Sequence, residues 1–285
     1  MANAQAGTHR TRQVDDLVIS RFVRAGAEVE VIETSSAHRA TRRIQQALAT
    51  GADTVVTAGG DGSAHLVTQL IAGTDVALGL IPAGTGNDAA RALGLPRHSA
   101  ADAADLILDG TPRSIDLGKV GATWFLTIMA AGFDAITNDR AGRMSFPPGS
   151  AVYTAAVFRE LPSFRPLSYV LDLDGQQRRL DAMLVAVGNL DRYGGGLQMC
   201  AGADPSDGLF DVVIIHPVSR LELLKIFPKV RSGGHVTHPA FERVRARSVT
   251  VAAAGVTAYA DGEWLGALPL TATCVSAALR VYAPS

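Results

Sequence analysis

Two glycine-rich turns carry the residue types that bind phosphate. They are Gly59–Ser63 (GGDGS) and Gly84–Asp88 (GTGND). Glycines let the main chain turn sharply and present N–H groups to phosphate oxygens without interference from a Cβ atom. In the first turn, Asp61 can bind a phosphate-associated Mg²⁺ and Ser63 can donate to a phosphate oxygen. A tight turn that caps a helix would use the same residue types, so the first turn alone leaves both interpretations open.

Each turn follows a predicted buried strand, over residues 53–58 and 76–81, and precedes a predicted helix. A further strand is expected over 28–33, and helices over 14–23 and 38–49. Strands that alternate with helices predict a parallel, doubly wound sheet, in which ligands bind at the carboxyl ends of strands. The two turns should therefore lie side by side. A purely structural explanation would have to account for each separately, so the pair favours phosphate binding.

The second half of the chain has short strand-like runs separated by Gly, Asp and Pro turns, a pattern that predicts an antiparallel sandwich or barrel. These runs are 123–130, 168–173, 181–188, 210–215, 248–253 and 256–260. Two helices are expected, near 150–161 and 218–227. The change of pattern places the domain boundary at about 112–118.

The composition is that of an ordinary globular protein, with 47% hydrophobic and 19% charged residues. Because 26 Lys and Arg nearly cancel 27 Asp and Glu, the net charge is -1, which argues against a dedicated nucleic-acid binder. Two cysteines cannot form a disulfide framework, and they favour a reducing compartment. No apolar stretch is long enough to cross a bilayer, and the first residues lack the apolar core of a secretory signal. We therefore expect a cytoplasmic protein with no transmembrane segment.

The second turn belongs to a longer run, PAGTGNDAARALGLP, and with GGDGS it resembles the diacylglycerol kinase catalytic domain family, which includes sphingosine and ceramide kinases. The likeness is closest to the soluble bacterial diacylglycerol and lipid kinases of the actinobacterial type. GGDGS alone would also fit NAD kinases and phosphofructokinases, from which the GTGNDxAR run and a DGE motif separate this chain. Further matches follow in the same order, at Ile115–Gly118 (IDLG), Gly132–Asp134 (GFD), Tyr193–Gly196 (YGGG), Ala203–Leu209 (ADPSDGL) and Ala260–Glu263 (ADGE).

The resemblance implies an α/β nucleotide-binding domain over residues 1–115, with a parallel sheet like that of NAD kinases and diacylglycerol kinases. A β-sandwich domain that binds lipid would cover 116–272, and the segment of about 273–285 would return to the first domain. ATP would be held between the domains. The matching positions for ATP and its Mg²⁺ are Thr34, Gly59, Gly60, Asp61, Gly62, Ser63, Gly84, Thr85, Asn87 and Asp88.

Catalytic roles are implied for Glu263 and Asp61. Glu263 matches the catalytic carboxylate of the family. A lipid hydroxyl is a poor nucleophile, and a positioned carboxylate can accept its proton as phosphoryl transfer proceeds. Without the resemblance, Asp-Gly-Glu would be interpreted as an ordinary hairpin turn.

A second metal site is implied at a turn in the second half. Asp204 and Asp207 lie three residues apart, where both carboxylates could face one hard cation. The resemblance implies a structural Mg²⁺ bound by these two residues and by the carbonyl of Leu209. The same residues also suit a solvated turn. His235 and His238 lack an evident third ligand, and we expect both to be exposed.

The N-terminus departs from the family, whose members begin with an apolar strand that leads into an Asn-Pro-x-Ser/Ala-Gly turn. Here Asn3–Gly7 (NAQAG) resembles the end of that turn, and Met1 stands where the strand should end. We therefore expect the first strand of the sheet to be missing and the start to be truncated. Exposed sheet edges would favour a homodimer.

Two basic segments suit an anionic membrane surface, although solvated loops would look the same. Residues 225–247 contain six Lys and Arg against one acid, and residues 140–148 mix basic and apolar groups. The expected function is an ATP-dependent lipid kinase that converts diacylglycerol to phosphatidic acid in phospholipid metabolism, as a peripheral protein. Two alternatives are a kinase for a sphingoid base, ceramide or polyprenol, and a catalytically degenerate protein that binds nucleotide or lipid.

Overall fold

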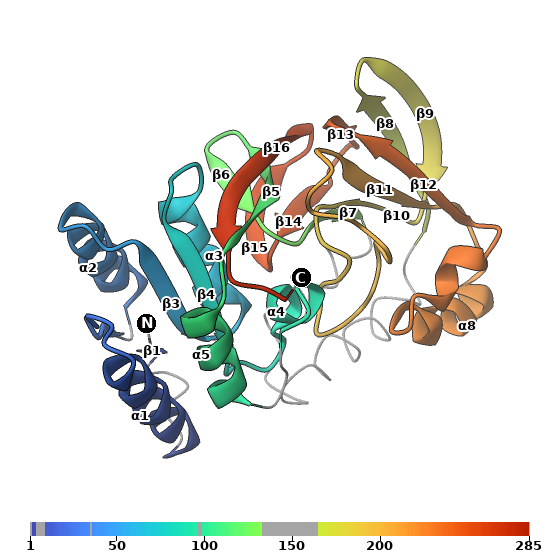
Figure 1. The fold of residues 1–285 in the computed structure, drawn as a ribbon. Coiled ribbons are helices and arrows are strands. Elements are labelled where there is room, and N and C mark those ends of the chain that lie inside the picture. The colour runs from blue at the N-terminus through green and yellow to red at the C-terminus, as the bar shows by residue number, and fades with distance from the viewer. Residues whose placement is uncertain (1, 4–8, 35, 96–98, 133–164, 285) are drawn as a thin grey trace. The chain divides into compact units, whose positions relative to one another are not determined.

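The computed structural model describes residues 2–3, 9–34, 36–95, 99–132 and 165–284. The chain forms two compact units (Figure 1). The first consists of Met1–Ile115 and Ala277–Ser285, and the second of Asp116–Ser276. Among the described residues, no helix is both long enough and apolar enough to cross a membrane.

The first unit is built on a parallel sheet. Its central strands β3 (Thr54–Gly59) and β4 (Ala77–Pro82) pair along their whole length. Beyond β4, the last residues of β16 (Leu270–Val281) continue the sheet in parallel. Beyond β3 lie the two-residue strands β1 (Ala2–Asn3) and β2 (Glu33–Thr34). The C-terminal segment thus returns to this unit.

The helices of this unit cover the sheet in two sets (Figure 1). Helix α1 packs against α5, which packs on β4, whereas α2 packs against α3, which packs on β3. The apolar contacts on the α1 and α5 side include Val18, Phe22, Ile81 and Ile107. The helices are α1 (His9–Arg24), α2 (Ala37–Ala49), α3 (Asp61–Ile71), α4 (Asp88–Ala92) and α5 (Ala100–Asp109).

The strand predicted over 28–33 is wrong except at its last residue. Residues 27–32 form no strand, and only Glu33–Thr34 pairs, as β2. The physical reason is the partner strand, because β1 lies between β2 and β3 and contributes just two residues. Ala2 pairs with Glu33 on one side and with Ala58 on the other.

Two cavities flank this part of the sheet. One, of about 340 Å³, is lined by Val18 and Phe22 of α1, Ile107 of α5 and Val56 of β3. The other, of about 460 Å³, reaches Ile44 of α2 and the same strand.

The second unit is a β-sandwich. One sheet has the order β12-β11-β10-β7-β14-β15, and all of its pairings are antiparallel. Its strands are β7 (Ile128–Gly132), β10 (Leu184–Gly188), β11 (Phe210–Ile215), β12 (Phe241–Ala246), β14 (Thr257–Ala260) and β15 (Glu263–Ala267).

The other sheet contains the first part of β16, followed by β13, β8 and β9, with β5 and β6 beside β16. Their bounds are β5 (Arg113–Val120), β6 (Thr123–Phe125), β8 (Leu167–Leu173), β9 (Gln176–Ala182) and β13 (Ser248–Ala252). One buried cluster joins the two sheets, and it includes Phe125, Tyr169 and Phe210. Alternating apolar residues along the strands produce this core, since every second side chain points inward.

The helix predicted near 218–227 is confirmed as α8 (Arg220–Val230), which begins where the Ser219 side chain accepts a hydrogen bond from the Glu222 N–H. The short 3-10 helix η2 (Gly234–Thr237) follows it. The helix expected near 150–161 lies outside the described residues, as does the segment 140–148.

The predicted exposure of His235 is wrong, because only 1% of this residue is exposed. Its ring packs edge-on against Phe241, and its Nε2 lies 3.1 Å from the Met199 carbonyl oxygen. Burial lowers the pKa of His235. His238 is partly buried, and its Nε2 lies 3.2 Å from the Glu222 carboxylate.

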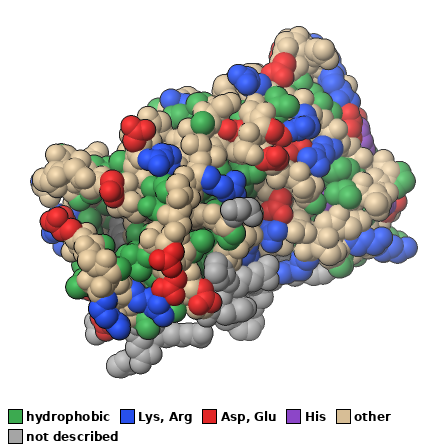
Figure 2. Space-filling model, viewed as in Figure 1, with side chains coloured by type: hydrophobic (Ala, Val, Ile, Leu, Met, Phe, Trp, Pro, Cys, Tyr) green, Lys and Arg blue, Asp and Glu red, His purple; other side chains and the backbone are tan. Residues whose placement is uncertain are grey.

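Charged side chains of both signs are interspersed on the face shown in Figure 2. The basic residues of segment 225–247 fall into two groups. Arg243 and Arg245 form ion pairs with Asp211 and Asp207, respectively, whereas Lys225, Lys229 and Arg231 at the end of α8 are exposed. The basic residues of β12 are thus engaged within the protein, and those of α8 face outward.

Candidate nucleotide site and catalytic hairpin

The two glycine-rich turns lie side by side, because they follow neighbouring strands whose last residues, Gly59 and Pro82, pair in register. The N–H groups of Ala83 and Gly84 both donate to the Gly59 carbonyl, at 3.0 and 3.1 Å. A Cβ atom on Gly84 would overlap the Cα of Gly60 and lie 2.9 Å from its nitrogen. Only glycine at this position allows the two main chains to approach so closely.

The first turn opens helix α3, and it leaves the start of that helix accessible. Gly60 is the N-cap residue, and no side chain caps the helix. A Cβ atom on Gly62 would meet nothing within 4 Å, so there is open space in front of the first helical turn. Main-chain N–H groups and the helix dipole favour an anion at such a place. Ser63 is buried, and its hydroxyl lies close to Gly59.

Asp61 connects the two turns. Its Oδ1 accepts a hydrogen bond from the Ala89 N–H in the first turn of α4, at 3.2 Å. A Cβ atom on Gly86 would lie 2.6 Å from the Asp61 Oδ2, so this carboxylate fits closely against the second turn. The side chain that we expect near ATP and its Mg²⁺ therefore also fixes the spacing of the two loops.

The second turn is shaped by Asn87, which has a left-handed backbone with φ 53°. Its side-chain oxygen accepts from the Gly84 N–H at 3.0 Å, and its amide nitrogen donates to the Gly84 carbonyl at 2.7 Å. Asn87 thus closes the turn. Asp88 is buried and Thr85 is exposed. At the end of β2, the hydroxyl of Thr34 accepts a hydrogen bond from the Ser36 N–H at 3.1 Å.

Glu263 belongs to the second unit, where it begins strand β15 of the hairpin formed with β14. It pairs with Ala260 across the hairpin, and its side chain is exposed. The next residue, Trp264, is also 63% exposed, which is unusual for so large an apolar side chain.

Asp261 anchors the tip of this hairpin, a role that the sequence did not indicate. Its carboxylate accepts hydrogen bonds from the N–H groups of Leu126 and Thr127, both at 2.8 Å, and from the Thr127 hydroxyl at 2.6 Å. Asp261 itself has φ 53°, which Asp tolerates better than most residues. The carboxylate therefore ties the turn before Glu263 to the segment that connects β6 and β7.

A buried asparagine extends this anchor. Asn189 is 1% exposed, and its amide nitrogen donates to the carbonyls of Asp116 and Leu126, both at 2.9 Å. No spacing pattern identifies Asn189, because its partners lie more than 60 residues away in sequence.

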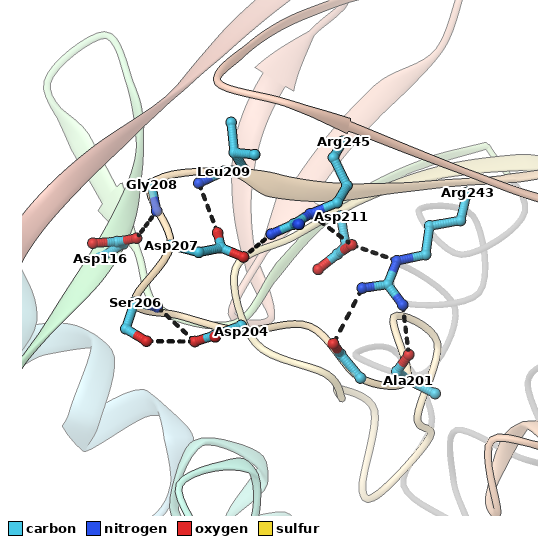
Figure 3. A network of polar contacts seen from close by, with 11 residues as sticks. Asp116, Ala201, Asp204, Ser206, Asp207, Gly208, Leu209, Asp211, Arg243 and Arg245 are labelled. Atoms are coloured by element: carbon cyan, nitrogen blue, oxygen red, sulfur yellow. Dashed lines mark hydrogen bonds and ion pairs between the residues drawn. The ribbon is translucent and has the colours of Figure 1, made fainter.

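The implied metal residues lie in a loop whose polar groups are already engaged (Figure 3). Asp204 Oδ1 accepts from the Ser206 N–H at 3.0 Å and from the Ser206 hydroxyl at 2.5 Å. Asp207 Oδ1 accepts from the Leu209 N–H at 3.0 Å, and its Oδ2 pairs with Arg245. Mg²⁺ requires octahedral oxygen ligands and tolerates few distortions. With a guanidinium on one Asp207 oxygen and an N–H on the other, these residues do not fit a bound Mg²⁺.

Comparisons with known proteins agree with this architecture. Residues 1–120 match the diacylglycerol kinase catalytic domain, and residues 127–283 match the YegS C-terminal NAD kinase beta sandwich-like domain. The chain is 42% identical over 272 residues to a diacylglycerol kinase of Mycobacterium tuberculosis, covering 93% of this chain and 88% of the relative. It is 31% identical over 256 residues to a diacylglycerol kinase of Bacillus subtilis, covering 88% and 84%.

Solved structures show the same fold. A diacylglycerol kinase from Bacillus anthracis superposes with a TM-score of 0.75 at 19% identity, covering 99% of this chain and 94% of the other. An NAD kinase from Archaeoglobus fulgidus in complex with ATP gives 0.54 at 13% identity, covering 97% and 90%. The predicted fold class, a kinase-type parallel sheet followed by a β-sandwich, is confirmed. The chain belongs to the diacylglycerol kinase family.

Proposed function

We propose that this protein is an ATP-dependent lipid kinase that transfers the γ-phosphoryl group of MgATP to the hydroxyl of diacylglycerol. The proposal depends most on one observation, the contact of two glycine-rich turns at neighbouring strand ends. Relatives at 42% and 31% identity are named diacylglycerol kinases, which supports the choice of acceptor.

In this proposal the first unit binds the nucleotide. The uncapped start of α3 and the Gly60 main chain would bind phosphate oxygens, while Gly84, whose N–H already donates to Gly59 and Asn87, would shape the neighbouring turn. Phosphoryl transfer depends mainly on alignment and charge neutralisation. Asp61, held by the Ala89 N–H, would contact the Mg²⁺ that arrives with ATP. Thr34 would contact the nucleotide from the end of β2.

The second unit supplies the base. Glu263 would accept the proton of the lipid hydroxyl as the new P–O bond forms and the bond to ADP breaks. Its carboxylate is exposed, which supports a role in which a substrate hydroxyl reaches it, and the Asp261 hydrogen bonds in the turn before it would hold its position. Asp261 is then a positioning residue.

The identity of the lipid acceptor is tested by incubating the protein with radiolabelled ATP, Mg²⁺ and one lipid acceptor at a time in mixed micelles. We expect labelled phosphatidic acid from diacylglycerol and at least tenfold less product from ceramide, a sphingoid base or a polyprenol. Faster labelling of one of those acceptors would correct the substrate. If none of these acceptors is labelled while the protein still binds ATP, the protein would instead be a catalytically degenerate protein that binds nucleotide or lipid.

We further propose that the enzyme reaches its substrate as a peripheral protein on anionic membranes. The outer face of α8 supports this, because Leu221 is 72% exposed and Lys225 and Lys229 are exposed nearby. Vesicles with and without 30 mol% phosphatidylglycerol provide the test, and sedimentation should require the anionic lipid. Lys225→Glu combined with Lys229→Glu should reduce binding to the anionic vesicles. If wild-type protein binds neutral and anionic vesicles equally, electrostatic attraction to the membrane is contradicted.

A further inference from the structure

We propose that Arg245 provides at Asp207 the positive charge that a structural Mg²⁺ would provide, so that the loop of residues 201–209 folds without a metal ion. The proposal depends on the family membership that makes a metal here an expectation. It does not depend on the lipid kinase activity.

The loop brings acidic side chains together in a small volume (Figure 3). Asp204 and Asp207 belong to the loop, Asp211 follows in β11, and Asp116 of β5 receives the Gly208 N–H on its Oδ2 at 2.6 Å. Asp116 and Asp211 are 3% and 1% exposed. Buried carboxylates close to one another need compensating cations or hydrogen bonds.

Two arginines of β12 supply that compensation. Arg243 pairs through its Nε with the Asp211 carboxylate, and its two terminal nitrogens donate to the carbonyls of Ala201 and Gly202, at 3.2 and 3.1 Å. Arg245 pairs with Asp207, and its Nε also lies 3.9 Å from Asp211 Oδ1. Burial raises the pKa of Asp211, and the hydrogen bond from Arg243 opposes this shift.

The main chain closes the loop from the other side. The Asp116 N–H donates to the Pro205 carbonyl at 2.6 Å, and its side chain accepts from Gly208. The loop is therefore attached at its start by Arg243, in its middle by Asp116 and at Asp207 by Arg245. These contacts hold the loop in place, which is the structural role that bonds to a metal ion would otherwise have.

A divalent cation would have to displace the guanidinium. Asp207 would lose its ion pair with Arg245, and the released arginine would remain beside the new positive charge because β12 holds its backbone next to β11. The two arginines of β12, Arg243 and Arg245, thus both lie beside the one carboxylate of β11, Asp211.

The test measures Mn²⁺ binding to the nucleotide-free protein by the loss of the free Mn²⁺ electron paramagnetic resonance signal. We compare wild type with Asp207→Asn. The expected result is that both proteins titrate identically, because no ion binds at Asp207. A site in wild type with a Kd below about 1 mM that is lost in Asp207→Asn would overturn the proposal.

The second measurement is thermal unfolding of Arg245→Gln, with Arg178→Gln as the matched control. Arg178 of β9 also pairs with a carboxylate of another element, Glu242 of β12, and is similarly exposed. We expect Arg245→Gln to lower Tm by about 1–4 °C and, unlike the control, to regain stability when 10 mM Mg²⁺ is added. A Tm equal to that of wild type, or a rise with Mg²⁺ in wild type that Asp207→Asn abolishes, would show that Arg245 does not replace a metal.

Discussion

Removing the Asp261 carboxylate should damage both the stability of the second unit and the catalytic step. In Asp261→Ala, the N–H groups of Leu126 and Thr127 lose their acceptor, as does the Thr127 hydroxyl. Leu126 and Thr127 are 1% and 4% exposed, so water cannot readily replace the carboxylate. The substitution also places alanine at φ 53°, a left-handed conformation that Asp tolerates better than alanine does.

The magnitude follows from these contacts. A buried donor without an acceptor costs about 1–3 kcal/mol, so two N–H groups give a loss of about 2–6 kcal/mol. For a chain of this size, each kcal/mol lowers Tm by about 2–4 °C, which predicts a fall of roughly 4–24 °C. If the hairpin shifts by about 1 Å, the misplaced Glu263 should reduce kcat by about 100-fold.

The matched control is Asp174→Ala. Asp174 also precedes a glycine at a hairpin tip, has φ 51°, and accepts hydrogen bonds from the N–H groups of Arg247 and Ser248 at 3.0 and 2.7 Å. It lies in the turn between β8 and β9, so it should lose stability and keep kcat. Asp261→Asn retains an acceptor and tolerates the backbone conformation, and we expect an intermediate effect.

The assay combines scanning fluorimetry with initial rates of phosphatidic acid formation, measured at least 10 °C below each Tm. We expect Asp261→Ala to lower kcat with little change in the KM for ATP. If kcat stays within twofold of wild type while Tm falls, Asp261 stabilises the fold without positioning Glu263. An equal loss of kcat in the Asp174 control would also contradict a positioning role for Asp261.

Three further predictions concern the first unit, acid stability and a buried thiol. Gly84→Ala should force the two turns apart, which lowers Tm and raises the KM for ATP at least tenfold. In Gly62→Ala the new Cβ atom meets open space, so this variant should raise the KM for ATP without lowering Tm. Unchanged KM values in both variants would contradict the phosphate site. The hydrogen bond from Arg178 lowers the pKa of Glu242 from its ordinary value of 4.5, so its stabilisation is complete above that pH and lost as pH falls through the lower folded-state pKa. Denaturant unfolding from pH 3 to 7 should therefore show Glu242→Gln less stable than wild type near pH 7 and equal to it in acid, and a constant difference would be inconsistent with this sign. Burial raises the pKa of Cys274 to about 12, so native protein should leave this thiol unreacted with iodoacetamide at pH 8 while unfolded protein alkylates it, as peptide mass spectrometry can show.

The parts of the fold that local sequence specifies were predictable. Strands β3 and β4 are short, largely apolar runs that end in glycine-rich turns, and both features follow from residues adjacent in the chain. The family and fold class predicted from these turns are confirmed. The nucleotide and catalytic roles remain predictions.

The parts of the fold that were predicted wrongly or missed depend on contacts between residues distant in sequence. The run 28–33 has a strand pattern, yet a strand also needs a partner, and β1 provides only two residues. Strand β12 was missed because its charges resemble those of a solvated loop until Arg243 is seen against Asp211. His235 was expected at the surface, because no local pattern shows that Phe241 covers it.

In the candidate site, too, features set by adjacent residues were predictable and features set by distant contacts were not. The spacing in GGDGS and GTGND predicts which main-chain groups can approach a phosphate. It does not predict that Asn87 closes its own turn, because that depends on a left-handed backbone. Asp261 was visible as part of a motif, whereas its partners Leu126 and Thr127 lie more than 130 residues earlier.

The most direct test of the account is the turnover of Glu263→Gln with saturating MgATP and diacylglycerol. This substitution keeps the size of the side chain and removes its ability to accept a proton. We expect kcat to fall at least 100-fold, because general base catalysis contributes about 10²–10⁴-fold. ATP binding, measured by calorimetry, should stay within twofold of wild type. A Glu263→Gln protein that retains wild-type turnover would contradict the proposed mechanism.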